Sequence, residues 1–340
     1  MASSRYTFNR LSRAALTKAT MSNLGETYKS KIVLFRKAKA FARDHGISTA
    51  ARRTIWRLHF ARFQKLRKRL ALLRGDAAPF TQFLGSKFEL HPSNAGLSEE
   101  LIMFGAHEPV ATGVYSRHLS VGDHVLDVGS NIGFWLLLAS QQVGDRGRVL
   151  GFEPVPSNYD ILQRNIKRSG RKNIEIRPWA LGSESGNALF YQSEVPNWGS
   201  LMSDSRLLPT GSFSVSVKTL DLILREFPTF RPTAMRMDVE GAELMVLKGA
   251  QGLLKRFRPT LFIEFHPFIL GWTAIRTALT ELGNGGYERG VLIERTWDQP
   301  WISKWVRERR CWSGSINALI RKIESPNDGL VGSTFTLILR

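Results

Sequence analysis

A glycine-rich turn between two apolar segments constrains the fold of this 340-residue chain more than any other feature. The segment reads VLDVGSNIGFW from Val125 to Trp135. It predicts a buried strand over residues 124–128, a tight turn at Gly129 and Gly133, and a helix over residues 134–142. This order is typical of the first unit of a parallel α/β sheet, in which the turn presents backbone N–H groups to a ligand.

The remainder of the chain continues the alternation of strands and helices. Further strands are expected over residues 148–152, 174–178, 234–237, 260–265, 287–293 and 335–339, with helical patterns between most of them. The pattern predicts a Rossmann-like α/β fold with a seven-stranded, mostly parallel sheet and flanking helices. Cys311 is the one cysteine, which excludes an internal disulfide and a cysteine-based metal site. No apolar run approaches the roughly 18 residues that a membrane-spanning helix needs.

Positive charge is concentrated at the N-terminus. Residues 1–70 hold 18 Lys and Arg against two acids, Glu26 and Asp44, and so carry +16 of the net charge of +19. We therefore expect a basic, partly helical extension over residues 1–85 and a catalytic domain over residues 86–340. No secretory signal is visible, which predicts a cytoplasmic protein.

The basic extension has three possible roles. Residues 28–74 combine apolar stripes at helical spacing with many cations, a pattern that favours peripheral contact with an anionic membrane. Two alternatives stay open: an arm that binds nucleic acid, or a helix packed on the catalytic body with its charges in water.

Two acids at the ends of the first two expected strands indicate which ligand the glycine turn binds. Asp127 ends the first expected strand, and Glu153 ends the second, where its carboxylate can accept hydrogen bonds from ribose hydroxyls. The spacing of Gly129 and Gly133 lacks the glycine pattern of a dinucleotide site, and Asp127 would repel a pyrophosphate. S-adenosylmethionine has no phosphate and carries a sulfonium cation and an amino group. The charges therefore favour S-adenosylmethionine over NAD.

The sequence resembles the FkbM family of S-adenosylmethionine-dependent methyltransferases over about residues 98–267. The resemblance rests on VLDVGSNIGFW, on FEPVPSNYDILQRNIKRSG, on ALGSESG, and on TLDLI followed by MRMDVEGAELMVLKGAQGLLKRFRPTLFIEFHP. It implies a class I methyltransferase fold that methylates a hydroxyl oxygen, and it places Ala180 and Leu181 against the adenine ring. Arg236 departs from the family, which usually has Lys there. The expected cofactor residues are Asp127, Gly129, Ser130, Asn131, Gly133, Glu153, Pro154, Ala180, Leu181 and Asp238.

Candidate catalytic residues follow the next two strands. Asp238 and Glu240 come after the strand at 234–237, and Glu264 and His266 end the strand at 260–265. Because ligands bind beyond the carboxyl ends of such strands, all four are expected at the methyl-transfer site. His266 is the predicted general base, since a hydroxyl acceptor must lose a proton. Glu243 is expected to face solvent or cap the following helix. No residues show metal-ligand spacing, so no metal site is predicted, although scattered carboxylates could hold Mg²⁺.

Three functions compete at this stage. The first is O-methylation of a small-molecule, glycan or lipid-linked acceptor. The second is a nucleic-acid methyltransferase that uses the basic arm, and the near-neutral charge of residues 71–340 argues against it. The third is a non-catalytic binding module, and the intact Asp127, Glu153 and Asp238 argue against it.

Overall fold

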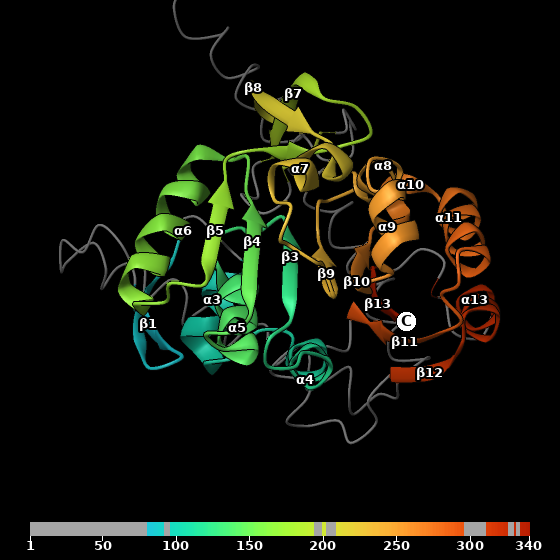
Figure 1. Ribbon diagram of the computed structural model, residues 1–340, viewed down its shortest axis with the longest axis horizontal. Helices are drawn as coiled ribbons and strands as arrows, with labels where there is room; N and C mark the ends of the chain where they lie inside the picture. Colours follow the sequence, from blue (N-terminus) through green and yellow to red (C-terminus); the bar gives the residue numbers. More distant parts are fainter. Residues whose placement is uncertain are drawn as a thin grey trace, which may run out of the picture. The chain divides into compact units, whose positions relative to one another are not determined.

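The computed structural model describes residues 80–91, 96–193, 199–201, 209–295, 311–325, 330 and 334–340 (Figure 1). The chain divides into two compact units, Met1–Ala77 and Ala78–Arg340, and all described residues belong to the second. The helical pattern expected within residues 28–74 lies outside the described residues.

One eight-stranded sheet forms the centre of the second unit (Figure 1). Its order is β12 (Cys311–Ser315), β11 (Arg289–Glu294), β13 (Phe335–Leu339), β10 (Thr260–Phe265), β9 (Ala234–Met237), β3 (His124–Val128), β4 (Arg148–Phe152) and β5 (Ile174–Arg177). Strands β3, β4, β5, β9 and β10 are parallel, and β13 is antiparallel to both of its neighbours. The expected Rossmann-like fold is confirmed, and β12 extends the seven expected strands by an eighth.

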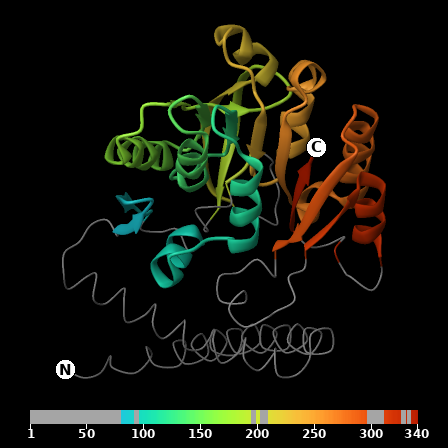
Figure 2. The same cartoon turned by 60° about the horizontal axis from the view of Figure 1, so that its bottom comes forward.

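Helices cover both faces of this sheet. One group consists of α3 (Leu97–Phe104), α4 (Pro109–His118), α5 (Phe134–Val143) and α6 (Pro156–Ser169). The other group consists of α7 (Leu220–Glu226), α8 (Glu243–Lys248), α9 (Gln251–Phe257), α11 (Trp272–Asn284) and α13 (Ile316–Glu324). Helices α11 and α13 lie side by side beside the C-terminal strands (Figures 1 and 2). The short helix α10 (Pro267–Leu270) connects β10 to α11.

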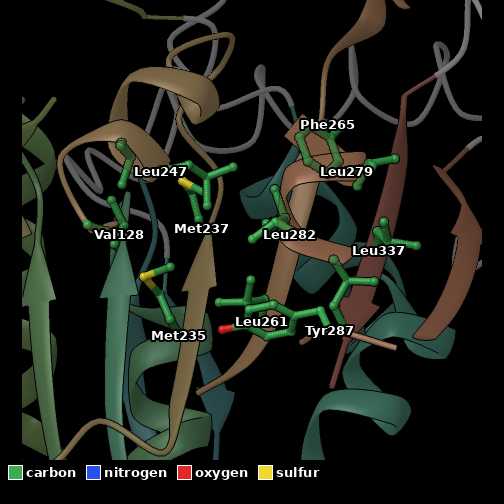
Figure 3. Packing of buried hydrophobic residues seen from close by; sticks show 14 of the residues in the cluster. Val128, Met235, Met237, Leu247, Leu261, Phe265, Leu279, Leu282, Tyr287 and Leu337 are labelled. Carbon is green, nitrogen blue, oxygen red and sulfur yellow. The ribbon is translucent and has the colours of Figure 1, made fainter. Parts of the chain in front are cut away.

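The alternation of side chains along each strand divides the core into two layers. In β3, Leu126 and Val128 pack into one hydrophobic cluster, whereas Val125 packs into the other. In β10, Leu261 belongs to the first cluster and Phe262 to the second. Figure 3 shows the first layer, where Met235 and Met237 of β9 lie among side chains from β10, β13 and the neighbouring helices. Because these strands are covered on both faces, their sequences are mostly apolar and do not alternate between apolar and polar residues.

Two smaller sheets flank the central one. The hairpin β1 (Phe80–Phe83) and β2 (Ser86–Glu89) is fixed by Phe83, which stacks on Phe134 at 4.7 Å, and by Asn165, which bonds to the backbone of Glu89. The expected domain boundary at residue 86 would cut this hairpin. The second sheet contains β6 (Ala180–Leu181), β8 (Pro209–Lys218) and β7 (Gly186–Ser193). None of the described helices is long and apolar enough to cross a membrane.

Candidate active site

A continuous cavity of about 360 Å³ lies beyond the carboxyl ends of β3, β4, β9 and β10. This position is where open α/β sheets bind ligands, at the point where the strand order reverses around β3. The structure brings eleven of the expected residues to its wall: Gly129, Ser130, Asn131, Glu153, Pro154, Ala180, Leu181, Asp238, Glu240, Glu264 and His266. Asp127 and Gly133 do not contribute to the wall.

The glycine turn brings the backbone of β3 close to the start of the segment after β9. Gly129 has a φ of 81°, and a Cβ atom on it would collide with the carbonyl oxygen of Asp238. Gly133 has a φ of 99° and immediately precedes α5, where a Cβ would meet Leu162 at 2.7 Å. Gly129 is thus required at the cavity, whereas Gly133 serves the turn and the packing of α5 on α6.

Glu153 ties the glycine turn to the end of β4. Its side chain is buried, and its two carboxylate oxygens accept hydrogen bonds from the backbone N–H groups of Asn131 at 2.7 Å and Val155 at 3.0 Å. Burial raises the pKa of Glu153 to about 7, although these N–H groups act to lower it. Asn158 donates a longer bond of 3.4 Å to Oε1 of Glu153. A carboxylate has about four acceptor positions, so Oε2 keeps one for a hydroxyl of the cavity, and displacement of the long Asn158 bond would free a second on Oε1.

Arg236 on β9 links the acids that follow β3 and β9. Its guanidinium donates to Asp238 at 2.8 Å and to the carbonyl oxygen of Gly129 at 3.1 Å, and it lies 3.4 Å from Asp127. Burial raises the pKa of Asp127, which is fully buried, and Arg236 opposes that shift. The resemblance expects lysine at this position. A lysine ammonium lacks the planar guanidinium with which Arg236 reaches all three acceptors. Asp127 therefore lies beneath the cavity and holds Arg236, while Asp238 lines the wall.

His266 lies between two carboxylates from the segment after β9. Its Nδ1 is 2.7 Å from Glu243 Oε1, and its Nε2 is 3.1 Å from Glu240 Oε2. Glu243 is fully buried and also accepts the N–H of Gly241, which corrects the expectation that it faces solvent. The backbone of Glu240 has a φ of 50°, a left-handed conformation that non-glycine residues seldom adopt.

These contacts shift the ionisation of the buried groups. Burial alone would lower the pKa of His266, but the carboxylates of Glu240 and Glu243 raise it well above its usual value. Burial raises the pKa of Glu240; His266 opposes this shift, while Asp238 and Glu243 add to it. Since both ring nitrogens of His266 have carboxylate partners, the arrangement does not favour this residue as the proton acceptor.

A second buried ionic network, which sequence reasoning missed, lines the same cavity. Glu108 lies 2.9 Å from Arg295 and 3.1 Å from His107, and Arg295 lies 3.4 Å from Glu264. Burial acts to lower the pKa of His107, but the carboxylates of Glu108 and Glu100 raise it to about 9. His107 and Glu108 come from the α3–α4 connection and Arg295 directly follows β11, outside the recognised motifs, whereas Glu264 lies on β10 within one of them. The sequence held one local signal for the position of Glu108: it directly precedes Pro109, a residue type that often begins a helix, and Pro109 begins α4.

The wall of the cavity fits a nucleoside with a positively charged tail. Phe152, Trp179, Ala180 and Leu181 supply an apolar surface beside Glu153, which suits an adenine ring and its ribose. At the other end, the Oδ1 atom of Asp238 is buried without a hydrogen-bond partner among the described residues, so it can accept from a cationic group. The cationic guanidinium of Arg236 is already engaged by carboxylates rather than free for a phosphate.

Comparisons with known proteins agree with this geometry. The methyltransferase FkbM domain family matches residues 127–302. The chain is 31% identical over 144 residues to the hexuronic acid methyltransferase AglP of Haloferax volcanii, covering 42% of this chain and 56% of AglP. It is 27% identical over 143 residues to Methyltransferase 1 of Beauveria bassiana, covering 37% and 57%. The chain thus matches just over half the length of these curated relatives.

Among solved structures, the methyltransferase FkbM from Methylobacillus flagellatus is similar at 18% sequence identity. The superposition covers 65% of this chain and 44% of that chain, with a TM-score of 0.41.

Proposed function

Because the chain belongs to the FkbM methyltransferase family, we propose that it methylates an oxygen atom of a small-molecule, glycan or lipid-linked acceptor. The cofactor is S-adenosylmethionine, which supplies an electrophilic methyl group on a sulfonium sulfur. One observation carries the proposal: a single cavity is lined both by Glu153 and the glycine turn and by Asp238, Glu240 and His266.

The acceptor end of the cavity suits a sugar-like molecule. Trp135 and Phe268 line it together with the carboxylates of Glu240 and Glu264. Aromatic rings pack against the apolar faces of a sugar, while carboxylates accept hydrogen bonds from its hydroxyls. AglP, a relative named for hexuronic acid, supports the same class of acceptor.

The residues of this chain accelerate transfer mainly by alignment. Glu153 and the glycine turn would hold the cofactor, and the wall formed by Asp238, Glu240 and Glu264 would hold the acceptor beside it. A hydroxyl acceptor must also lose its proton. Because the ring of His266 is engaged on both sides, we assign proton acceptance to Glu240 or Asp238 and give His266 the role of positioning Glu240.

The base assignment has a direct kinetic test. Replacement Glu240→Gln should lower turnover by about 10²–10⁴-fold and leave cofactor affinity unchanged, because the lost group acts on the acceptor. Unchanged turnover in a folded Glu240→Gln protein would remove Glu240 from this role.

The acceptor class is tested with methyl-labelled S-adenosylmethionine and the full-length protein. Lysate is divided into lipid, glycan, nucleic-acid and protein fractions, and label is expected in the glycan or lipid fraction. Label in nucleic acid would instead support a nucleic-acid methyltransferase. A protein that binds no S-adenosylmethionine would support the non-catalytic alternative.

Residues 28–74 would bring the enzyme to its acceptor at an anionic membrane surface. The support is the sequence, in which eight cations surround an apolar stripe between residues 52 and 69. Each cation near an anionic leaflet contributes about 1 kcal/mol. Full-length protein should float with anionic vesicles at low salt and not with neutral ones, and glutamine replacements of Lys65, Arg67, Lys68 and Arg69 should weaken flotation. Wild-type protein that stays in the soluble fraction would contradict this role.

A further inference from the structure

Three side chains of different chemistry converge at the acceptor end of the cavity. Asp238, Glu240 and His266 each place one ligand atom so that these atoms all lie within 4.8 Å of one another. Two of the residues follow β9 and the third ends β10, so adjacent strands of the sheet fix their positions. Two carboxylate oxygens and one imidazole nitrogen are a ligand set suited to divalent cations.

The orientation of His266 is the first specific sign of a cation site. Glu243 is fully buried, and its Oε1 lies 2.7 Å from Nδ1 of His266. A carboxylate that accepts the Nδ1–H fixes the tautomer and turns Nε2 outward as a ligand, which is the usual arrangement behind metal-binding histidines. Nε2 of His266 lies 3.1 Å from Glu240 Oε2, so a cation that binds both atoms must displace the proton between them.

The second sign is the bonding of Asp238. Its Oδ2 is held by Arg236 at 2.8 Å, while its Oδ1 is buried and has no hydrogen-bond partner among the described residues. A buried, unpaired carboxylate oxygen is costly unless a cation or a donor satisfies it. Three carboxylates, those of Asp238, Glu240 and Glu243, lie around one imidazole. Arg236 forms an ion pair with one of them, Asp238.

We propose that Asp238, Glu240 and His266 form a binding site for a divalent cation of the Mg²⁺ or Mn²⁺ class, with Glu243 as the positioning residue behind His266. The proposal rests on the methyltransferase function and refines the role of Asp238 and Glu240 there. A cation at this point would lie on the cavity wall, where it could attract the oxygen atoms of an acceptor and hold them in position. Sugars and hydroxy acids, which carry neighbouring oxygen atoms, are acceptors that such a site would select.

Binding of Mn²⁺ to the chelator-treated, full-length protein tests the site without any acceptor. Electron paramagnetic resonance or calorimetry should detect Mn²⁺ binding to the wild-type protein. Glu240→Gln and His266→Gln each remove a ligand and should weaken binding about tenfold or more, and Glu243→Gln should weaken it about 10–100-fold through the orientation of His266. Glu175→Gln is the matched control, because it removes a carboxylate on β5 outside the cavity and should leave Mn²⁺ affinity unchanged.

The outcomes separate this proposal from the proposed function. Cofactor affinity of Glu240→Gln is measured beside Mn²⁺ affinity, and an unchanged value shows that the variant is folded. Failure of the wild type to bind millimolar Mn²⁺ or Mg²⁺, or equal binding by Glu240→Gln, would overturn the cation site even if methyl transfer is observed. Mn²⁺ binding that depends on Glu240 and His266 supports the site even if no acceptor is ever methylated.

Discussion

The affinity for S-adenosylmethionine should depend on pH through Glu153. This residue is buried at the cavity wall, and its pKa is raised to about 7. Only the carboxylate accepts hydrogen bonds from both ribose hydroxyls, so protonation weakens binding. If the carboxylate form alone binds, the apparent dissociation constant should rise about tenfold between about pH 8 and about pH 6.

Replacement Glu153→Ala should remove both the affinity and its pH dependence. Each of the two charge-assisted hydrogen bonds contributes no more than roughly 1.5–3 kcal/mol. We therefore expect the affinity of the variant at pH 8 to be at least about tenfold lower than that of the wild type. Calorimetric titration at several pH values measures both effects. Glu175→Ala is the control, because Glu175 lies on β5 outside the cavity and pairs with Arg148 and Arg177. If Glu153→Ala binds more weakly yet keeps the wild-type pH profile, another group titrates and the reasoning fails.

Three further predictions concern stability and are read from urea unfolding. Folding raises the pKa of His107 from 6.5 to about 9, so its stabilisation, at most about 3 kcal/mol, is fully present below pH 6.5 and is lost as pH rises through 9. The loss of stability in His107→Gln should therefore be larger at pH 6 than near pH 10, by at most about 3 kcal/mol; a difference that is constant with pH would contradict this. Gly129→Ala should cost at least about 2 kcal/mol because of its positive φ and the collision with Asp238, whereas Gly186→Ala, which has open space around it, should change stability by less than about 0.5 kcal/mol. Arg236→Lys should cost about 1–3 kcal/mol by losing the planar fork, and an unchanged midpoint would show that the fork is unimportant.

The strands of the central sheet could be predicted because their signal is local. Runs such as residues 124–128 and 260–265 are mostly apolar, as expected for strands covered on both faces, and each is followed by glycine or polar residues. The hairpin at Phe80–Glu89 also had a local signal, the Leu84–Gly85 turn between alternating residues, which the expected domain boundary overlooked.

The pairing of side chains across the site could not be predicted in the same way. Asp238, Glu240 and His266 were located correctly at strand ends, because position in an α/β sheet follows from the chain order. The burial of Glu243 against His266 depends on how α8 packs beside β10, and the contact of Glu108 with Arg295 joins segments far apart in sequence. Neither contact has a periodic or spacing signal in the sequence, so both emerged only from the fold.

The position of the transferred methyl group tests the central claim most directly. Full-length protein is incubated with ¹³C-methyl S-adenosylmethionine and the glycan or lipid fraction that takes up label, and the product is analysed by NMR. The account predicts an O-methyl carbon on the acceptor, formed by the wild type and strongly reduced in Glu240→Gln. A label found on nitrogen or carbon, or cofactor binding without any methyl transfer to an oxygen, would contradict it.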